Sequence, residues 1–302
     1  MARNFIIEVL ITLSIIITLL LTSCDSNELG AVEDLYLDIP DSNFEAILVD
    51  QGIDTDGIIN QKMLAKDAAQ VGVLELPYSS DRVIEDLTGI EGFVNLKKLI
   101  ATQHNIENID LSSNTSLDTL YLAGNYISSI DISNNTNLLL LDVQSNQLNS
   151  IVGLAKATHL KDLNLSFNDM QELTIHNEFL ETLLASHNLL HTINTGAAKR
   201  LRNILLISNE LVTIDLSSNT LLETLLVSDN NIQGIDLLFN EQLTHLYISS
   251  NILHALDLTN NLALIDLRVD RNPYLGCIKI HSGQNIANVS ISENQVLSVH
   301  CD

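Results

Sequence analysis

The sequence predicts a β-rich solenoid, a curved, right-handed stack of about ten short coils that share one parallel sheet. Three observations support this fold class. Leu begins a unit that recurs every 20 to 22 residues, apolar residues alternate within each unit, and an Asn stands at the ninth position of almost every unit. The units begin at Leu96, Leu117, Leu138, Leu160, Leu180, Leu201, Leu222, Leu243 and Leu264.

The repeat has a physical reason, because one coil of about 20 residues cannot bury its own apolar side. Stacked coils bury a continuous column of Leu and Ile, and the alternation predicts a short strand with one face inward. The Asn turns the chain away from the strand, and its amide can pair with backbone groups that the turn leaves free. These residues are Asn125, Asn146, Asn168, Asn188, Asn209, Asn230, Asn251 and Asn272. In the first clear coil, His104 takes the place of the Asn.

The pattern resembles the leucine-rich repeat, and the match covers residues 71–273. The second half of the unit, L-x-x-L-D-L-x-x-N, resembles a nested bacterial variant with a 21-residue repeat. Its Asp and second Asn positions hold Asp110, Asp131, Asp215, Asp236, Asp257, Asn114, Asn135, Asn219, Asn240 and Asn261. These half-coils are too short for a long helix. We therefore expect turns or short 3₁₀ pieces opposite the sheet, with less regular coils over residues 138–200.

The first 23 residues predict a lipoprotein signal peptide. Arg3 precedes a largely apolar run over residues 5–21, which is typical of a secretory signal. Leu21-Thr22-Ser23-Cys24 resembles a lipobox, which implies lipidation and cleavage at Cys24. The alternative is an uncleaved single-span anchor, because about 17 apolar residues are at the lower limit for spanning a bilayer. The resemblance implies an outer-membrane lipoprotein of the cell envelope, exposed at the cell surface.

A tether and a helical cap are expected between the lipidated residue and the first coil. Residues 24–38 are polar and acidic, and residues 39–70 form the predicted cap. Asp41 can cap a first helix, and a second helix is expected over residues 61–69. The start of this cap, from Ile39 to Phe44, resembles caps of surface proteins of the Bacteroidetes type. Residues 86–91 resemble the first coil of internalin-type proteins.

The cap contains a candidate calcium loop. Residues 54–60 fit positions three to nine of an EF-hand loop, with Asp54, Asp56 and Asn60 as candidate ligands. Positions one and twelve are then Gly52 and Met63, so two ligands of such a loop are missing. We therefore expect a Gly-containing turn, with calcium binding as the alternative. No other metal and no cofactor is expected.

Residues 274–302 are expected to form a C-terminal cap, because Pro273 breaks the repeat. With Cys24 lipidated, Cys277 and Cys301 are the remaining pair of Cys residues. Outside the cytoplasm such a pair favours a disulfide, and two unpaired thiols are the alternative. The segment 272–278 resembles the C-terminal cap of the same surface proteins, which implies that the two residues are bridged.

Charge and composition exclude several classes of function. The net charge of -24 disfavours nucleic acid and anionic lipid, so the membrane is expected to be contacted through the lipid anchor only. The absence of Trp, with 6 Tyr and 6 Phe in the chain, disfavours a glycan platform. No nucleophile, phosphate loop or converging His residues stand out, so we expect no enzyme.

The repeat itself predicts a binding face. The position between the fourth and sixth residues of the unit faces the concave side, and four successive coils place an apolar residue there. Contiguous exposed apolar surface often marks a partner site. The alternative is that these side chains only stabilise the sheet. The candidate residues are Tyr121, Leu184, Leu205, Leu226 and Tyr247, with Arg202, His245 and Arg268 beside them.

These predictions favour a cell-surface protein that recognises or adheres to a protein ligand through its concave face. The alternative is an accessory subunit of an outer-membrane uptake or assembly complex. The fold alone does not distinguish the two, because one fold hosts many functions.

Overall fold

The computed structural model describes residues 35–301, and residues from Tyr36 onward form one compact unit. The predicted signal peptide, the lipidation site Cys24 and most of the predicted tether lie outside the described residues. Within the described part, no helix has the length and apolar character that a membrane crossing needs.

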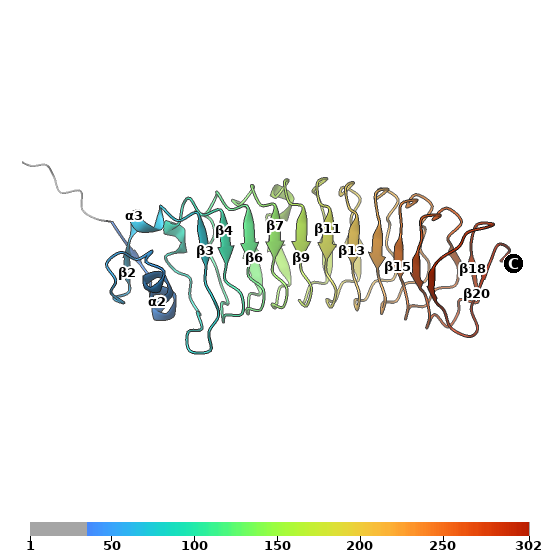
Figure 1. Cartoon of the computed structure of the whole chain (residues 1–302), viewed down its shortest axis with the longest axis horizontal. Coiled ribbons are helices and arrows are strands. Elements are labelled where there is room, and N and C mark those ends of the chain that lie inside the picture. The colour runs from blue at the N-terminus through green and yellow to red at the C-terminus, as the bar shows by residue number, and fades with distance from the viewer. Residues whose placement is uncertain (1–34, 302) are drawn as a thin grey trace, which may run out of the picture. The chain divides into compact units, whose positions relative to one another are not determined.

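One sheet of 11 strands runs along the stack, and its strands form a row of arrows in Figure 1. All of its pairings are parallel, and they join equivalent positions of successive coils. The strands are β3 (Val73–Glu75), β4 (Lys98–Ile100), β5 (Thr119–Tyr121), β7 (Leu140–Asp142), β9 (Asp162–Asn164), β11 (Thr182–Leu184), β13 (Asn203–Leu205), β14 (Thr224–Leu226), β15 (His245–Tyr247), β17 (Asp266–Arg268) and β19 (Asn288–Ser290). The predicted β-rich solenoid with a parallel sheet is confirmed.

Each strand of this sheet has only three residues, and the middle one points into the coil. Leu183, Ile204 and Leu225 are such residues, and none of them has exposed surface. The first and third residues of the strand point to the opposite side, as the two-residue period of a strand requires. We call the surface formed by these first and third positions of the 11 strands the sheet face.

The other side of the coil contains short strands that the sequence did not predict. The expectation was turns or short 3₁₀ pieces, and the 3₁₀ helices η1 (Ile90–Gly92) and η2 (Leu154–Lys156) agree with it. Between such pieces the half-coils pair in parallel into three small sheets. These strands are β6 (Ser129–Asp131), β8 (Ser150–Val152), β10 (Glu172–Thr174), β12 (Thr192–Asn194), β16 (Leu256–Asp257), β18 (Cys277–Lys279) and β20 (Val296–Ser298).

The amides of the repeated Asn residues pair with backbone groups, as expected, and together they form a ladder of hydrogen bonds along the stack, which we call the Asn ladder. Asn209 is representative: its Nδ2 donates to the carbonyl of Ala185 at 3.0 Å, and its Oδ1 accepts from the N–H of Leu190 at 3.1 Å. Both partners lie in the preceding coil. Each Asn thus joins one coil to the one before it.

His104 performs the same task in its coil. Its Nδ1 accepts from the N–H of Ile84 at 3.2 Å, so Nε2 is the ring nitrogen that donates, to the carbonyl of Leu76 at 3.1 Å. Burial lowers the pKa of His104, which favours this neutral form. The exception in the sequence pattern therefore keeps the hydrogen-bonding pattern.

The N-terminal cap begins as predicted with a helix that covers the end of the stack. In α2 (Ser42–Asp50), the side chain of Asp41 accepts from two backbone N–H groups of the first turn, at 2.8 and 3.1 Å. Phe44 is fully buried, and its ring centroid lies 6.4 Å from that of Phe93 in the first coils. The helix thereby extends the core beyond the first strand.

The rest of the cap differs from the expected second helix. Residues 62–64 form strand β2 (Lys62–Leu64), and only α3 (Ala65–Ala68) is helical. Strand β2 pairs antiparallel with β1 (Tyr36–Asp38), which takes the last three residues of the predicted tether. The cause is Glu45, whose buried carboxylate accepts from the N–H groups of residues 60, 61 and 62 at 2.9, 2.9 and 3.1 Å. These bonds hold the segment extended.

At the C-terminal end the coils continue past residue 273, where the cap was expected to begin. Strand β19 joins the main sheet and β20 joins the sheet of β16 and β18. The bridge between Cys277 and Cys301 is confirmed, with Cα atoms 5.7 Å apart. Val289 stands opposite the core residue Leu267, yet it is 41% exposed because no described coil covers it.

Candidate binding face

Four neighbouring strands of the sheet face place apolar side chains in one row. The register pairs Leu184 with Leu205, Leu205 with Leu226, and Leu226 with Tyr247, so the predicted candidates lie on adjacent strands. All four are half-buried rather than exposed, since each packs beside its neighbours across about 4.8 Å. We call Leu184, Leu205, Leu226 and Tyr247 the apolar row.

The row ends in a polar cluster. The hydroxyl of Tyr247 donates to Asp266 Oδ2 at 3.1 Å, and the guanidinium of Arg268 lies 4.1 Å from the centre of the Tyr247 ring. Arg268 also pairs with Asp266, with Nε and Oδ1 3.6 Å apart. Burial and the hydrogen bond to Asp266 raise the pKa of Tyr247. This arrangement combines a carboxylate, a phenol and a cation stacked on the ring.

Two further candidates, Arg202 and His245, lie at the margin of the row. Arg202 is exposed and forms an ion pair with Glu223. His245 is half-buried at the first position of β15, with Nδ1 2.9 Å from the Thr244 hydroxyl. The sequence correctly placed both beside the row. It did not show that the charge of Arg202 already has a partner within the chain.

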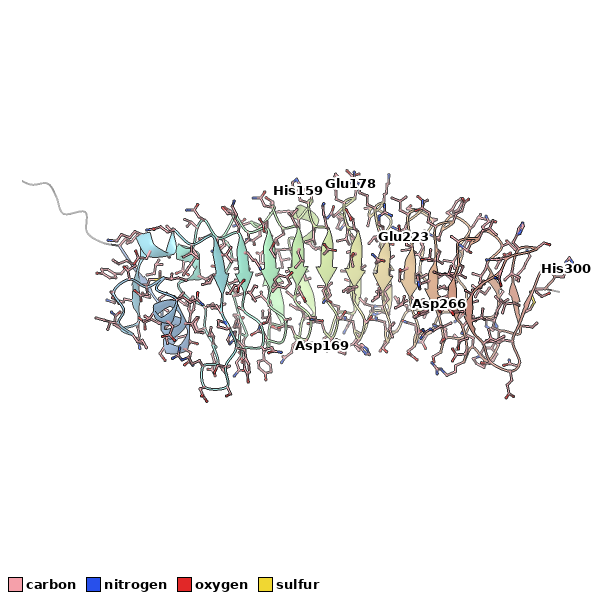
Figure 2. All side chains as sticks on the ribbon, viewed as in Figure 1. His159, Asp169, Glu178, Glu223, Asp266 and His300 are labelled. Carbon is pink, nitrogen blue, oxygen red and sulfur yellow. A yellow bond between two sulfur atoms is a disulfide. The ribbon has the colours of Figure 1, made fainter. Side chains whose placement is uncertain are left out.

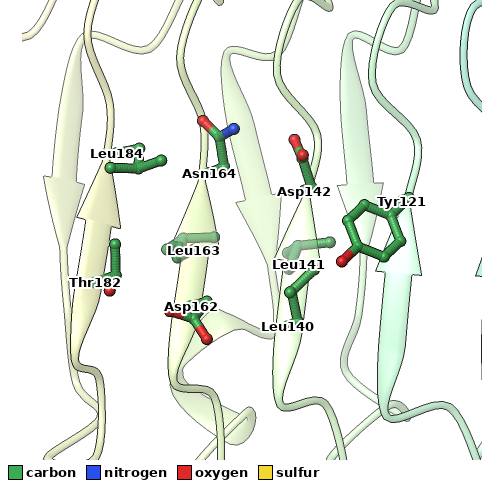
Figure 3. A pocket seen from close by; sticks show the side chains of 9 residues that line it. All are labelled: Tyr121, Leu140, Leu141, Asp142, Asp162, Leu163, Asn164, Thr182 and Leu184. Carbon is green, nitrogen blue, oxygen red and sulfur yellow. The ribbon is translucent and has the colours of Figure 1, made fainter.

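Further along the sheet face, between Tyr121 and Leu184, lies a depression of about 250 Å³. Figure 3 shows the two residues on β5 and β11, with the shorter side chains of β7 and β9 between them. The ring of Tyr121 leans toward β7 in this view. The lining residues are Tyr121, Leu140, Leu141, Asp142, Asp162, Leu163, Asn164, Thr182 and Leu184.

Two short polar residues create this depression. Asp142 and Asn164 occupy the third strand position, where the neighbouring strands have Tyr121 and Leu184. Both are held by the backbone two residues later: Asp142 accepts from the N–H of Gln144 and Asn164 from that of Ser166, each at 3.1 Å. Burial raises the pKa of Asp142. The signal in the sequence for this depression is the interruption of an apolar position by Asp142 and Asn164, and neither residue was among the candidates predicted from the repeat.

The candidate calcium residues lie together in the loop after α2. Asp56 accepts from the N–H of Ile58 at 2.8 Å and from Asn60 Nδ2 at 3.0 Å, so the loop closes on its own groups. Asp54 is buried, and burial together with the charge of Asp56 raises its pKa. Across residues 35–301, no three His, Cys, Asp or Glu side chains are grouped so that they could hold a metal ion. Residues 54–60 form a turn that is closed by its own groups, and calcium binding at Asp54, Asp56 and Asn60 stays a prediction.

The titratable side chains elsewhere are spread over the coils. Figure 2 shows His159 and Glu178 at one margin of the stack and Asp169 at the opposite margin. Asp266, on the sheet face, and Glu223, the residue before β14, have the ion-pair partners described above. The sheet face therefore combines three features along several coils: the apolar row, the polar cluster at Tyr247 and the depression at Asp142.

No protein-family model and no curated protein sequence matches this chain. Among solved structures, a leucine-rich-repeat protein of Leptospira interrogans matches with a TM-score of 0.62 and 22% identity, over 76% of this chain and 64% of that one. The LRIM1/APL1C complex matches with a TM-score of 0.59 and 23% identity, over 78% and 47%. The leucine-rich-repeat ectodomain of the Arabidopsis thaliana receptor kinase GASSHO1/SCHENGEN3, in complex with CASPARIAN STRIP INTEGRITY FACTOR 2, matches with 0.59 and 18%, over 74% and 30%.

These likenesses define the class of fold. This chain spans less than two thirds of the length of each of the three proteins. Together with the 11-stranded parallel sheet and the Asn ladder, they show a leucine-rich-repeat solenoid. The resemblance of the first coil to internalins, and of the cap to Bacteroidetes surface proteins, stays a prediction.

Proposed function

We propose that this protein is a non-enzymatic recognition module that binds a protein ligand through its sheet face. The observation that supports it is the apolar row, where the half-buried side chains of Leu184, Leu205, Leu226 and Tyr247 stand in register on adjacent strands, each with part of its surface accessible. Removing a contiguous apolar surface from water is favourable, so such a surface often marks a site for a partner. Single apolar residues scattered over a surface do not mark a site. Arg268 supplies the ring-stacked cation that is enriched at the centre of protein interfaces.

Two similar structures support a protein as the ligand. The LRIM1/APL1C structure is a complex of two proteins, and the GASSHO1/SCHENGEN3 ectodomain is in complex with CASPARIAN STRIP INTEGRITY FACTOR 2. We infer the same class of partner for this chain. The lipobox-like segment that ends at Cys24 supports display on the outer membrane by a lipid anchor, because several acyl chains hold a protein stably on a bilayer.

The test is a crosslinking pull-down from intact cells and from extracts of candidate neighbouring or host cells. The baits are residues 25–302 and the same protein with Leu205→Glu and Leu226→Glu. Leu189→Glu with Leu238→Glu is the matched control, because these residues are 42% and 49% exposed and lie outside the sheet face. Circular dichroism checks that all three proteins are folded.

We expect one or a few proteins, identified by mass spectrometry, that bind the parent and the control but not the sheet-face variant. Burying two unpaired carboxylates in an apolar contact costs several kcal/mol, enough to reduce binding by more than tenfold. Equal capture of the same membrane proteins by all three baits would contradict recognition through this row. That outcome would support the accessory-subunit alternative.

A further inference from the structure

We propose that the depression between Tyr121 and Leu184 receives a cationic side chain, Arg or Lys, of the protein partner. The inference rests on the proposed function, since it assigns one chemical group of the ligand to one place on the sheet face. It follows from three features of the depression: its size, the lack of a cationic partner for its carboxylates, and a related cluster elsewhere on the same sheet in which the chain supplies the cation.

The size fits one long side chain. The depression has a volume of about 250 Å³, room for roughly eight water molecules at about 30 Å³ each. An Arg side chain has seven non-hydrogen atoms. Leu140 and Leu184 form apolar walls on opposite sides, against which the methylene groups of such a side chain can pack.

The carboxylates of the depression have no cation of their own. Four carboxylates occupy outward strand positions on the sheet face: Glu75, Asp142, Asp162 and Asp266. The two outer ones have basic neighbours, since Glu75 pairs with Lys98 at 3.5 Å and Asp266 with Arg268 at 3.6 Å. None of the ion pairs found among residues 35–301 includes Asp142 or Asp162. Asp142 is half-buried, so an entering cation would offset the cost of its desolvation.

The same sheet contains a related cluster in which the chain supplies the cation itself. Tyr247 and Tyr121 occupy the same strand position, on β15 and β5, and five strands of the main sheet lie between them. The neighbour of Tyr247 on the next strand is Arg268, which stacks on its ring and pairs with Asp266. The neighbour of Tyr121 on the next strand is Asp142. At Tyr121 the position of Arg268 is taken by the carboxylate of Asp142 and the position of Asp266 by Leu140, while Asp162 follows one strand further along. A ring and two carboxylates are therefore present beside the depression without a cation of the chain, and a ligand with a cationic side chain would complete the set.

The direct test uses two acetylated pentapeptides with C-terminal amides, Gly-Leu-Arg-Leu-Gly and the same peptide with citrulline in place of Arg. Citrulline keeps the shape of Arg and removes its charge. Binding is followed by NMR of Leu methyl groups in the folded protein, with the signals of Leu140 and Leu184 assigned through Leu140→Ile and Leu184→Ile. The variant Asp142→Asn with Asp162→Asn removes both carboxylates. Its control, Asp169→Asn with Glu210→Gln, makes the same change in net charge at exposed residues outside the sheet face.

We expect the Arg peptide to shift the methyl signals of Leu140 and Leu184 with a dissociation constant on the order of millimolar. The citrulline peptide and the Asp142/Asp162 variant should each bind at least tenfold more weakly, and the control variant should match the parent. Equal binding of both peptides, or no shift at these two residues, overturns the inference. Shifts produced by calcium chloride in place of the peptide would also overturn it, in favour of a divalent cation.

The outcome is separable from that of the proposed function. If a partner captured in the pull-down is lost with Leu205→Glu and Leu226→Glu but binds the Asp142→Asn/Asp162→Asn protein unchanged, the sheet face recognises a protein and the cationic contact is refuted. If no captured protein depends on the apolar row, the proposed function fails whatever the peptides show.

Discussion

Removing one rung of the Asn ladder should have a cost that follows from its hydrogen bonds. Asn209 is buried; its Oδ1 is the acceptor for the N–H of Leu190, and its Nδ2 donates to Ala185 and Leu206. In Asn209→Ala the two carbonyls keep donors from other Asn side chains, at 3.3 and 2.9 Å. The N–H of Leu190 loses its acceptor. One orphaned buried N–H costs about 1–3 kcal/mol and two weakened carbonyl contacts cost about 0.5 kcal/mol each, so we expect a loss of about 3 kcal/mol.

The measurement is urea unfolding followed by far-ultraviolet circular dichroism, since the chain has no Trp to report by fluorescence. Asn231→Ala is the matched control, because Asn231 is exposed and only its backbone N–H is bonded, to Leu211. It should change the free energy of unfolding by less than about 0.5 kcal/mol. A loss below about 1 kcal/mol for Asn209→Ala, with an unchanged dependence on urea, would refute the claim that the ladder Asn satisfies groups that water cannot reach.

Three further perturbations test other parts of the fold. Burial lowers the pKa of His104, so the unfolded state binds more protons below pH 6.5 and the free energy of unfolding should fall as pH decreases from 7.5 to 5.5. His104→Asn should make this pH dependence shallower, and an unchanged slope would contradict the argument. Gly153→Ala should lower the melting temperature, because φ is +85° and a Cβ would lie 2.4 Å from a backbone nitrogen of the preceding coil. In the control Gly234→Ala the added Cβ meets nothing within 4 Å, so the melting temperature should not change, and equal effects of the two substitutions would refute the clash. Replacing Cys277 and Cys301 by Ser should destabilise the last coil by about 3 kcal/mol, given their separation of 24 residues; faster hydrogen exchange confined to β18 and β20 would show it, and unchanged exchange would count against it.

Much of the fold was predictable because each coil repeats the same local sequence pattern. The spacing of Leu and the ninth-position Asn predicted the main-sheet strands from β4 to β17 to within a residue, and the register of Leu184, Leu205 and Leu226 followed directly. Strand β19 lies in the segment that was expected to form the cap. The expected second helix over residues 61–69 is replaced in part by strand β2, because the carboxylate of Glu45 holds the N–H groups of residues 60–62 from 15 to 17 residues away in the chain. Local pattern does not show such a contact.

The candidate site was predictable only in part, for a related reason. Repeat register shows which side chains share a face, and it placed Tyr121 and Tyr247 correctly on the sheet face. It does not show the relative heights of side chains on neighbouring strands, which create the depression at Asp142. Nor does it show that the side chain of Arg202 is already paired.

The nearest-neighbour stacking of the coils has a mechanical consequence. Because each strand of the main sheet pairs only with those of adjacent coils, a pulling force applied to the two ends of the folded unit should peel coils away singly. A 21-residue coil then adds roughly 70 Å of extended chain at about 3.3 Å per residue. The disulfide between Cys277 and Cys301 prevents the 24-residue segment between them from extending, which removes on the order of 80 Å of length at the same rise. A force-extension trace should therefore show regular steps and end short of the full contour length until the disulfide is reduced.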